Sequence, residues 1–274
     1  MKASQMLWRD MGAVRAVAPY DAGIVLGTIM TVGLVIAGSL SSGLGAQMFH
    51  LGSFLLVFGG TIGAALIHYS IEDVRHAWES LCAVVRVQQS DPSARIAELV
   101  DLSHKVRKDG VLVLEREGYA VVDPFLRTAL QLTVDGHQPH DIRRILEHEL
   151  RASLDHERRA AQVFQTMGTY SPAMGLIGTL LGLIQMLATL DRPETLGPSM
   201  SLALITTLYG ALFANMFLLP MSGKIRNRTD EGALIKSITI EGVVSLGAQE
   251  NPMVLEQRLT SFLPPVVKRA QGGL

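Results

Sequence analysis

Three threonine side chains lie well inside two long stretches of sequence that contain no charged residue, away from the ends of the stretches. Thr179 belongs to the stretch 162–190, and Thr206 and Thr207 belong to the stretch 195–223. Uncharged oxygen atoms suit a hard cation such as sodium when a nearby acid completes the coordination shell. A threonine hydroxyl in a helix can instead bond back to a carbonyl of its own helix, which is a purely structural role. Together, the three threonines favour a cation pathway.

The same stretches lack the acid that such a pathway normally needs. Residues 22–71, 162–190 and 195–223 contain no Asp or Glu. A cation that crosses a bilayer normally meets a carboxylate or a ring of oxygen dipoles near the middle of the membrane. We therefore expect a partner subunit to contribute the carboxylate.

The uncharged stretches are long enough to cross a membrane. Hydrophobic residues make up 48% of the 274 residues and the mean hydropathy is +0.29, which is too apolar for an ordinary soluble protein. A crossing helix needs about 20 apolar residues. The first stretch breaks near 41–45 into two candidate spans, 22–40 and 49–70, and residues 191–194 separate the two later stretches. The sequence predicts an all-α membrane protein with four transmembrane helices, two plus two, and a helical cytoplasmic domain between spans two and three.

The distribution of basic residues predicts the orientation. Lys2, Arg9 and Arg15 precede the first span, whereas the turn at 41–48 has no basic residue. Both termini of this multi-pass membrane protein should therefore be cytoplasmic. The expected parts are an N-terminal cytoplasmic or interfacial extension (1–20), a first transmembrane hairpin (21–71), a cytoplasmic helical domain (72–161), a pore-lining second hairpin (162–223) and a cytoplasmic C-terminal helical tail (224–274).

Small residues and prolines mark the two later spans. Gly175, Gly178 and Gly182 allow the close approach of another helix, either from this chain or from a partner. Pro172 and Pro220 each remove a helix hydrogen bond and should bend the chain. Pro220 could instead simply end the fourth helix.

Capping and stop signals divide the cytoplasmic domain into short helices followed by one long helix. Asp91-Pro92 and Asp123-Pro124 are typical helix starts, and Asp109-Gly110 and Asp135-Gly136 are typical helix ends. After Pro139 the sequence has no glycine until Gly168, so a single helix should run from the cytosol into the third span.

Several other classes of function find no support in the sequence. There is no Walker loop, dinucleotide fingerprint, nucleophile with a plausible His base or HExxH motif, so we expect neither an enzyme nor a bound cofactor or metal. A net charge of -1 gives no overall attraction to nucleic acid. The single cysteine, Cys82, has no partner at metal-ligand spacing, and His50 and His68 are expected at span ends.

The third and fourth spans resemble the MotA/TolQ/ExbB family, and within it the flagellar stator subunits MotA, PomA and MotP. The resemblance lies in the run from Ser171 to Leu187 and in the run from Thr206 to Pro220. The cytoplasmic run from Arg107 to Glu115, followed by Asp123-Pro124, is also similar. The resemblance as a whole covers most of the chain after Asp21, whereas residues 1–20 look like an extension that the family usually lacks.

The resemblance implies a stator A subunit that converts cation flow into torque on the flagellar rotor. It implies a homo-oligomer, a pentamer, around a dimer of a single-span B subunit of the MotB or PomB type that carries the ion-binding Asp. It also implies that Arg107, Lys108 and Glu115 contact the rotor protein FliG. Thr179 and the Thr206-Thr207 pair are similar to the sodium-driven PomA type, which implies sodium as the transported cation, with protons as the alternative.

Two other functions stay open on the sequence. One is an energiser of the TolQ or ExbB kind, which drives an outer-membrane process. Such relatives have three spans, whereas residues 22–71 are long enough for a complete hairpin. The other is a helical scaffold that conducts no ion, in which Thr179 and Thr206 would tolerate Ala or Val.

Overall fold

The computed structural model describes residues 22–41, 43, 49–85 and 91–263, and all regular structure in these ranges is helical. The predicted all-α class is confirmed. The N-terminal extension expected at 1–20 lies outside the described residues. The chain divides into two compact units, one from residues 1–88 and 162–222 and the other from residues 89–161 and 223–274. Each unit is described here by itself.

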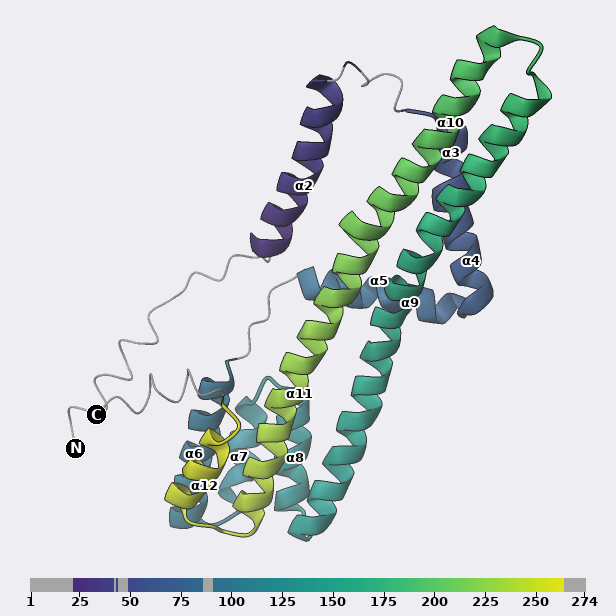
Figure 1. Ribbon diagram of the computed structural model, residues 1–274. Coiled ribbons are helices and arrows are strands. Elements are labelled where there is room, and N and C mark those ends of the chain that lie inside the picture. The colour runs from purple at the N-terminus through teal and green to yellow at the C-terminus, as the bar shows by residue number, and fades with distance from the viewer. Residues whose placement is uncertain (1–21, 42, 44–48, 86–90, 264–274) are drawn as a thin grey trace. The chain divides into compact units, whose positions relative to one another are not determined.

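Four apolar helical segments make up most of the first unit (Figure 1). The first span is α2 (Ala22–Ser41). The second span is continuous from Leu51 to His68 and consists of α3 (Leu51–Phe54), the π-helical segment η1 (Leu55–Gly59) and α4 (Gly60–His68). The third is the apolar half of α9 (Pro139–Ala188), and the fourth is α10 (Pro193–Leu212) with the π-helical segment η2 (Phe213–Leu218).

Helix α5 (Ile71–Val85) follows the second span and was not predicted as a separate element. Its start is fixed by reciprocal capping between two side chains. Ser70 Oγ accepts from the Asp73 backbone N–H at 3.1 Å, and Asp73 Oδ2 accepts from the Ser70 backbone N–H at 3.2 Å. This is the capping-box arrangement that satisfies free N–H groups at a helix start.

The second unit is a helical domain with its own apolar core. It contains α6 (Pro92–Asp109), α7 (Val113–Ala120), α8 (Pro124–Val134), the polar half of α9, α11 (Leu219–Gly247) from residue 223 onward, and α12 (Pro252–Thr260). Fully buried leucines and isoleucines from all six helices form the core: Leu99, Leu114, Leu126, Leu130, Ile142, Leu146, Ile238, Leu246, Leu255 and Leu259.

The predicted helix boundaries of this unit are confirmed, and the cause is local chemistry. Asp91 and Asp123 each accept a backbone hydrogen bond from the second residue after them, at 2.9 and 3.0 Å. Gly110 and Gly136 follow the ends of α6 and α8 with φ values of 84° and 78°, a region that favours glycine. The single long helix predicted after Pro139 is also present, as α9.

The fourth membrane helix continues beyond its expected end. Pro220 is the second residue of α11, and the helix runs on to Gly247. The alternative in which Pro220 terminates the helix is therefore wrong. The segment directly before Pro220 is π-helical, from Phe213 to Leu218. Pro172 likewise lies inside α9 without ending it. The expected bends at both prolines stay predictions.

Candidate ion pathway

The third and fourth spans pack together along a seam of small residues. A Cβ added at Gly175 would lie 2.9 Å from Thr206 O, and a Cβ added at Gly182 would lie 2.8 Å from Ala203 Cβ. A Cβ added at Gly210 would lie 2.7 Å from Ser171 O. The glycines thus serve packing within the chain, the first of the two roles that the sequence allowed. Figure 1 shows α9 and α10 running side by side.

Thr206 is enclosed in this seam. Its side chain is 1% exposed, and a Cβ added at Gly178 would lie 2.5 Å from Thr206 Cβ. The Thr206 hydroxyl donates to Ala203 O at 2.8 Å. The residue is therefore held on both sides, by its own helix and by the glycine face of α9.

Thr179 and Thr207 are less buried and also bond back to their own helices. Thr179 is half-buried, and its Oγ1 donates to Leu176 O at 2.6 Å. Thr207 is exposed, and its Oγ1 donates to Ala203 O at 3.3 Å. All three hydroxyls thus use their hydrogen inside the helix, as the structural alternative requires. A hydroxyl oxygen that donates its hydrogen still carries lone pairs, so it can also accept a cation.

One more polar residue shares a helix face with Thr207. Ala211 and Asn215 follow Thr207 at intervals of four residues, and all three are exposed. The Asn215 side-chain amide donates to Ala211 O at 2.9 Å. Sequence reasoning missed Asn215, although a side-chain amide inside an apolar run was the signal that could have identified it.

Polar contacts join the end of the second span to the third span, and join the third span to the fourth. Tyr69 Oη and Thr166 Oγ1 are 2.9 Å apart, and His68 Nδ1 and Tyr170 Oη are 3.1 Å apart. Ser171 Oγ donates to Gly210 O at 3.0 Å, directly beside Pro172. These bonds fix the register of the spans within the first unit.

The charged residues predicted to contact a rotor lie in the second unit. Arg107 and Lys108 are in the last turn of α6 and Glu115 is in the first turn of α7. All three are exposed, and among the described residues none of them forms an ion pair.

Lys105 and Glu117, which flank these charges in the sequence, are paired instead. Lys105 Nζ lies 2.8 Å from Glu117 Oε2 and 3.0 Å from Asp101 Oδ2. Hydrogen bonds to Glu117 and then to Asp101 raise the pKa of Lys105 above its usual value. This pair connects α6 to α7, and within the part of the chain that the structure describes it does not involve Arg107, Lys108 or Glu115.

Comparisons with known proteins give the chain a family. Residues 118–236 match the MotA/TolQ/ExbB proton channel family. The chain is 37% identical over 240 residues to an uncharacterized protein of Bacillus subtilis, with 88% of each chain covered. It is 35% identical over 245 residues to motility protein A of Aquifex aeolicus, with 89% of this chain and 96% of the relative covered. The chain belongs to the MotA/TolQ/ExbB family.

A further relative, PomA, and two solved MotAB structures are also similar to this chain. The chain is 31% identical over 243 residues to the chemotaxis protein PomA of Vibrio alginolyticus, covering 89% of this chain and 95% of PomA. The structure of MotAB from C. jejuni matches with a TM-score of 0.84 at 26% identity, covering 89% of this chain and 96% of that chain. The MotAB stator complex of Bacillus subtilis matches equally well, with 90% and 98% covered. The similarity to MotAB chains supports the four-span architecture.

Proposed function

We propose that this chain is the ion-conducting A subunit of a bacterial flagellar stator, set in the inner membrane with both termini in the cytoplasm. The observation that carries the proposal is the similarity, over about 89% of the chain, to motility protein A and PomA and to the fold of MotAB chains. A single-span B subunit would supply the acid that the spans lack in their sequence. No covalent bond is made or broken in this role.

Sodium is the cation that we propose, and protons are the alternative. The support comes from the hydroxyl oxygens of Thr179, Thr206 and Thr207, which are uncharged hard ligands close to one helix seam. Because each hydroxyl already donates its hydrogen to a helix carbonyl, its free lone pairs are oriented away from that carbonyl. Such an oxygen can join a carboxylate of the partner in a cation shell.

Torque would pass through the exposed charges of the second unit. Arg107, Lys108 and Glu115 are free to pair with complementary charges on the rotor protein FliG, since their neighbours Lys105 and Glu117 satisfy each other. The basic residues also suit the C-terminal end of α6, where they interact favourably with the helix dipole. The helix dipole alone, however, gives no reason for Arg107 and Lys108 to lack an acidic partner among the described residues, whereas a contact with the rotor does.

The proposed cycle uses a ring of copies, a pentamer, around the partner. A cation binds the Asp of the B subunit close to the threonine oxygens, and its release favours a step of rotation of the ring. The ring then moves the rotor through the exposed charges. A cation shell of this kind predicts that the speed of rotation saturates with cation concentration.

The experiment that tests the function measures rotation speed of tethered cells that carry only this stator and its native partner. External sodium is varied at constant pH and constant membrane potential. Speed that rises and saturates with sodium is the expected result. Full rotation without sodium would assign the proton as the cation, and absence of rotation with either ion would contradict the stator function.

Two substitutions at Thr206 test the role of its oxygen. Thr206→Ser keeps the hydroxyl, whereas Thr206→Val keeps the shape and removes the oxygen. We expect the half-saturating sodium concentration to rise about tenfold in the Val variant, the equivalent of about 1.4 kcal/mol, and to stay near the wild-type value in the Ser variant. Equal sodium dependence in both variants, with equal amounts of assembled complex, would remove Thr206 from the cation pathway.

A further inference from the structure

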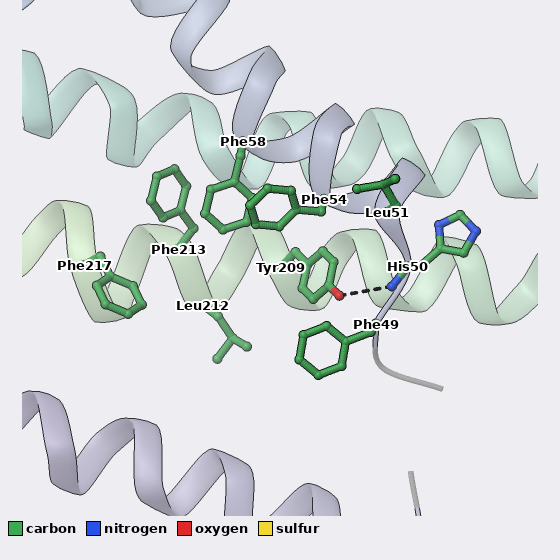
Figure 2. Close-up of a pocket in the computed structure, with 9 residues that line it drawn as sticks. All are labelled: Phe49, His50, Leu51, Phe54, Phe58, Tyr209, Leu212, Phe213 and Phe217. Atoms are coloured by element: carbon green, nitrogen blue, oxygen red, sulfur yellow. Dashed lines mark hydrogen bonds between the residues drawn. The ribbon is translucent and has the colours of Figure 1, made fainter. Parts of the chain in front are cut away.

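A cavity of about 520 Å³ lies between the second span and the fourth span (Figure 2). Its walls come from residues 49–58 at the start of the second span and residues 209–217 of the fourth span. Five of the eight phenylalanines in the chain line it, together with Tyr209. The lining is aromatic and aliphatic apart from His50 and Tyr209, it includes none of the three threonines, and the proposed cation pathway does not use it.

Both walls contain a π-helical segment. Phe58 belongs to η1, and Phe213 and Phe217 belong to η2. The ring centroids of Phe58 and Phe213 are 4.1 Å apart, so the two segments meet through these side chains. A second stack joins Phe54 to Phe58, with centroids 4.2 Å apart. π-helical turns are rare and occur frequently at functional sites, so two of them facing one cavity point to a ligand.

The cavity is polar at one end and apolar along the rest of its length. At the polar end the His50 backbone N–H donates to Tyr209 Oη at 3.4 Å, and His50 Nδ1 accepts from the Ser53 backbone N–H at 3.1 Å. Figure 2 shows His50 at one end and Phe217 at the other, with the Tyr209 hydroxyl directed toward His50. His50 directly precedes the second span, so the polar end lies where that span leaves the hydrocarbon. A ligand that matches this pattern has a polar head and a long apolar tail.

We propose that the cavity binds one acyl chain of a membrane phospholipid, with the headgroup beside His50 and Tyr209. Both walls belong to helices that are long and apolar enough to span a membrane, and α2 lies against η2, so we expect the part of the opening that α2 leaves uncovered to face hydrocarbon. The opening is accessible to that medium, because Phe49 is 90% exposed and Leu51 is 73% exposed. The volume lies within the range of about 300–1,000 Å³ that small-ligand sites occupy. An empty space of this size would forfeit the dispersion contacts of its aromatic walls, and an acyl chain restores them.

A phospholipid bound in this way would have a structural role. The acyl chain would lie along the ring stack of Phe54, Phe58 and Phe213, and it would also contact Leu212 of the fourth span. It would therefore hold the first hairpin against the second, at the level where both helices are π-helical. With the proposed orientation the headgroup belongs to the outer leaflet, and this detail alone rests on the proposed function.

The test counts the phospholipids retained by the complex of this chain with its native partner after purification in detergent. Native mass spectrometry compares the wild type with Leu212→Trp, which fills the cavity, and with Leu204→Trp. Leu204 is an exposed residue of α10 that does not line the cavity, so it is the matched control. We expect retained phospholipid in the wild type and the control, and its loss in Leu212→Trp. Dioleoyl phosphatidylglycerol added back to the delipidated complexes should bind at least about tenfold more weakly to Leu212→Trp. Equal retention and equal affinity in all three complexes would overturn the proposal.

A second measurement covers the case in which Leu212→Trp fails to fold and also identifies the occupant. Phe49 is replaced by p-benzoylphenylalanine, which is close to the native side chain, and native membranes are irradiated. A phospholipid adduct on the monomer is the expected product. A cross-linked species with the mass of two copies, or of this chain plus the partner, would show that protein covers the cavity and would overturn the proposal. Because neither measurement needs ion flow or rotation, failure here is distinct from failure of the stator function.

Discussion

At the scale of single residues, the seam between α9 and α10 explains why threonine and glycine occur together. Thr206 is buried because Gly178 leaves room for its side chain, and its hydroxyl donates a hydrogen bond to Ala203 O. A hydroxyl that is buried without a partner would cost about 1–3 kcal/mol, so the backbone bond is a condition for placing an oxygen there at all. The bond back to the helix is therefore compatible with a cation ligand, and the two interpretations of the threonines do not exclude each other.

Gly210 tests the seam directly. We expect Gly210→Ala to destabilise the complex by about 1–3 kcal/mol, since the new Cβ would meet backbone atoms, Ser171 O at 2.7 Å and Pro172 Cα at 3.2 Å. Gly223→Ala is the matched control, because nothing lies within 4 Å of a Cβ there and both glycines are inside helical segments. Helix propensity favours Ala at both positions by about 1 kcal/mol. Thermal unfolding of the purified complex measures the difference, and equal midpoints would contradict the close contact at Gly210.

At the scale of elements, the second unit joins its helices through a carboxylate between two guanidinium groups. Glu241 on α11 accepts from Arg143 on α9 at 2.7 Å and from Arg258 on α12 at 3.2 Å. Arg258 also pairs with Glu250 at 3.1 Å. The Glu241 side chain is only 16% exposed, so solvent screens these pairs less than it screens surface pairs.

Substitution of Glu241 should loosen this three-helix junction. We expect Glu241→Gln to lower the free energy of unfolding by about 1–3 kcal/mol, because two partly buried arginines lose their shared partner. Glu231→Gln is the control, since Glu231 is 67% exposed and its ion pair among the described residues is with Arg228 of its own helix, which is worth at most about 0.5 kcal/mol. Urea unfolding of the full complex, followed by circular dichroism, compares the two. A Glu241 effect no larger than the control would mean that the apolar core alone positions α9, α11 and α12.

At the scale of the whole molecule, apolar spans and exposed charges belong to one chain, and two helices, α9 and α11, contain residues of both units. Successive turns of each helix are hydrogen-bonded to one another, apart from the bond that Pro172 removes in α9 and the bond that Pro220 removes in α11. A chain built in this way can transmit a displacement in the spans to the helical domain. This is the property that a torque-transmitting subunit requires.

The rotor contact is a prediction about the assembled motor. We expect Arg107→Glu to reduce the fraction of motile cells strongly, and a charge reversal at the complementary acidic position of FliG to restore it. The control is Arg144→Glu, since Arg144 is exposed in the same domain but already pairs with Asp141 at 2.9 Å. Swimming in soft agar measures both. If no reversal on the rotor restored motility at Arg107 or at Glu115, an electrostatic contact would be excluded as the route of torque.

The sequence by itself determined the features that depend on neighbours along the chain. Uncharged runs of sufficient length fixed the four spans, and Asp91, Asp123, Gly110 and Gly136 fixed helix ends, because capping bonds and backbone preferences act within a few residues. The long helix after Pro139 was predicted for the same reason. The family resemblance also came from contiguous runs, such as the one from Thr206 to Pro220.

Only the tertiary structure decided the features that join residues far apart in the chain. The burial of Thr206 depends on Gly178, and the aromatic cavity depends on contacts between Phe58 and Phe213, 155 positions later. The fourth helix continues past Pro220, and the segment before it is π-helical, which no local sequence pattern predicted. Packing between helices sets these features, and packing energy is the sum of many contacts whose partners a linear sequence does not identify.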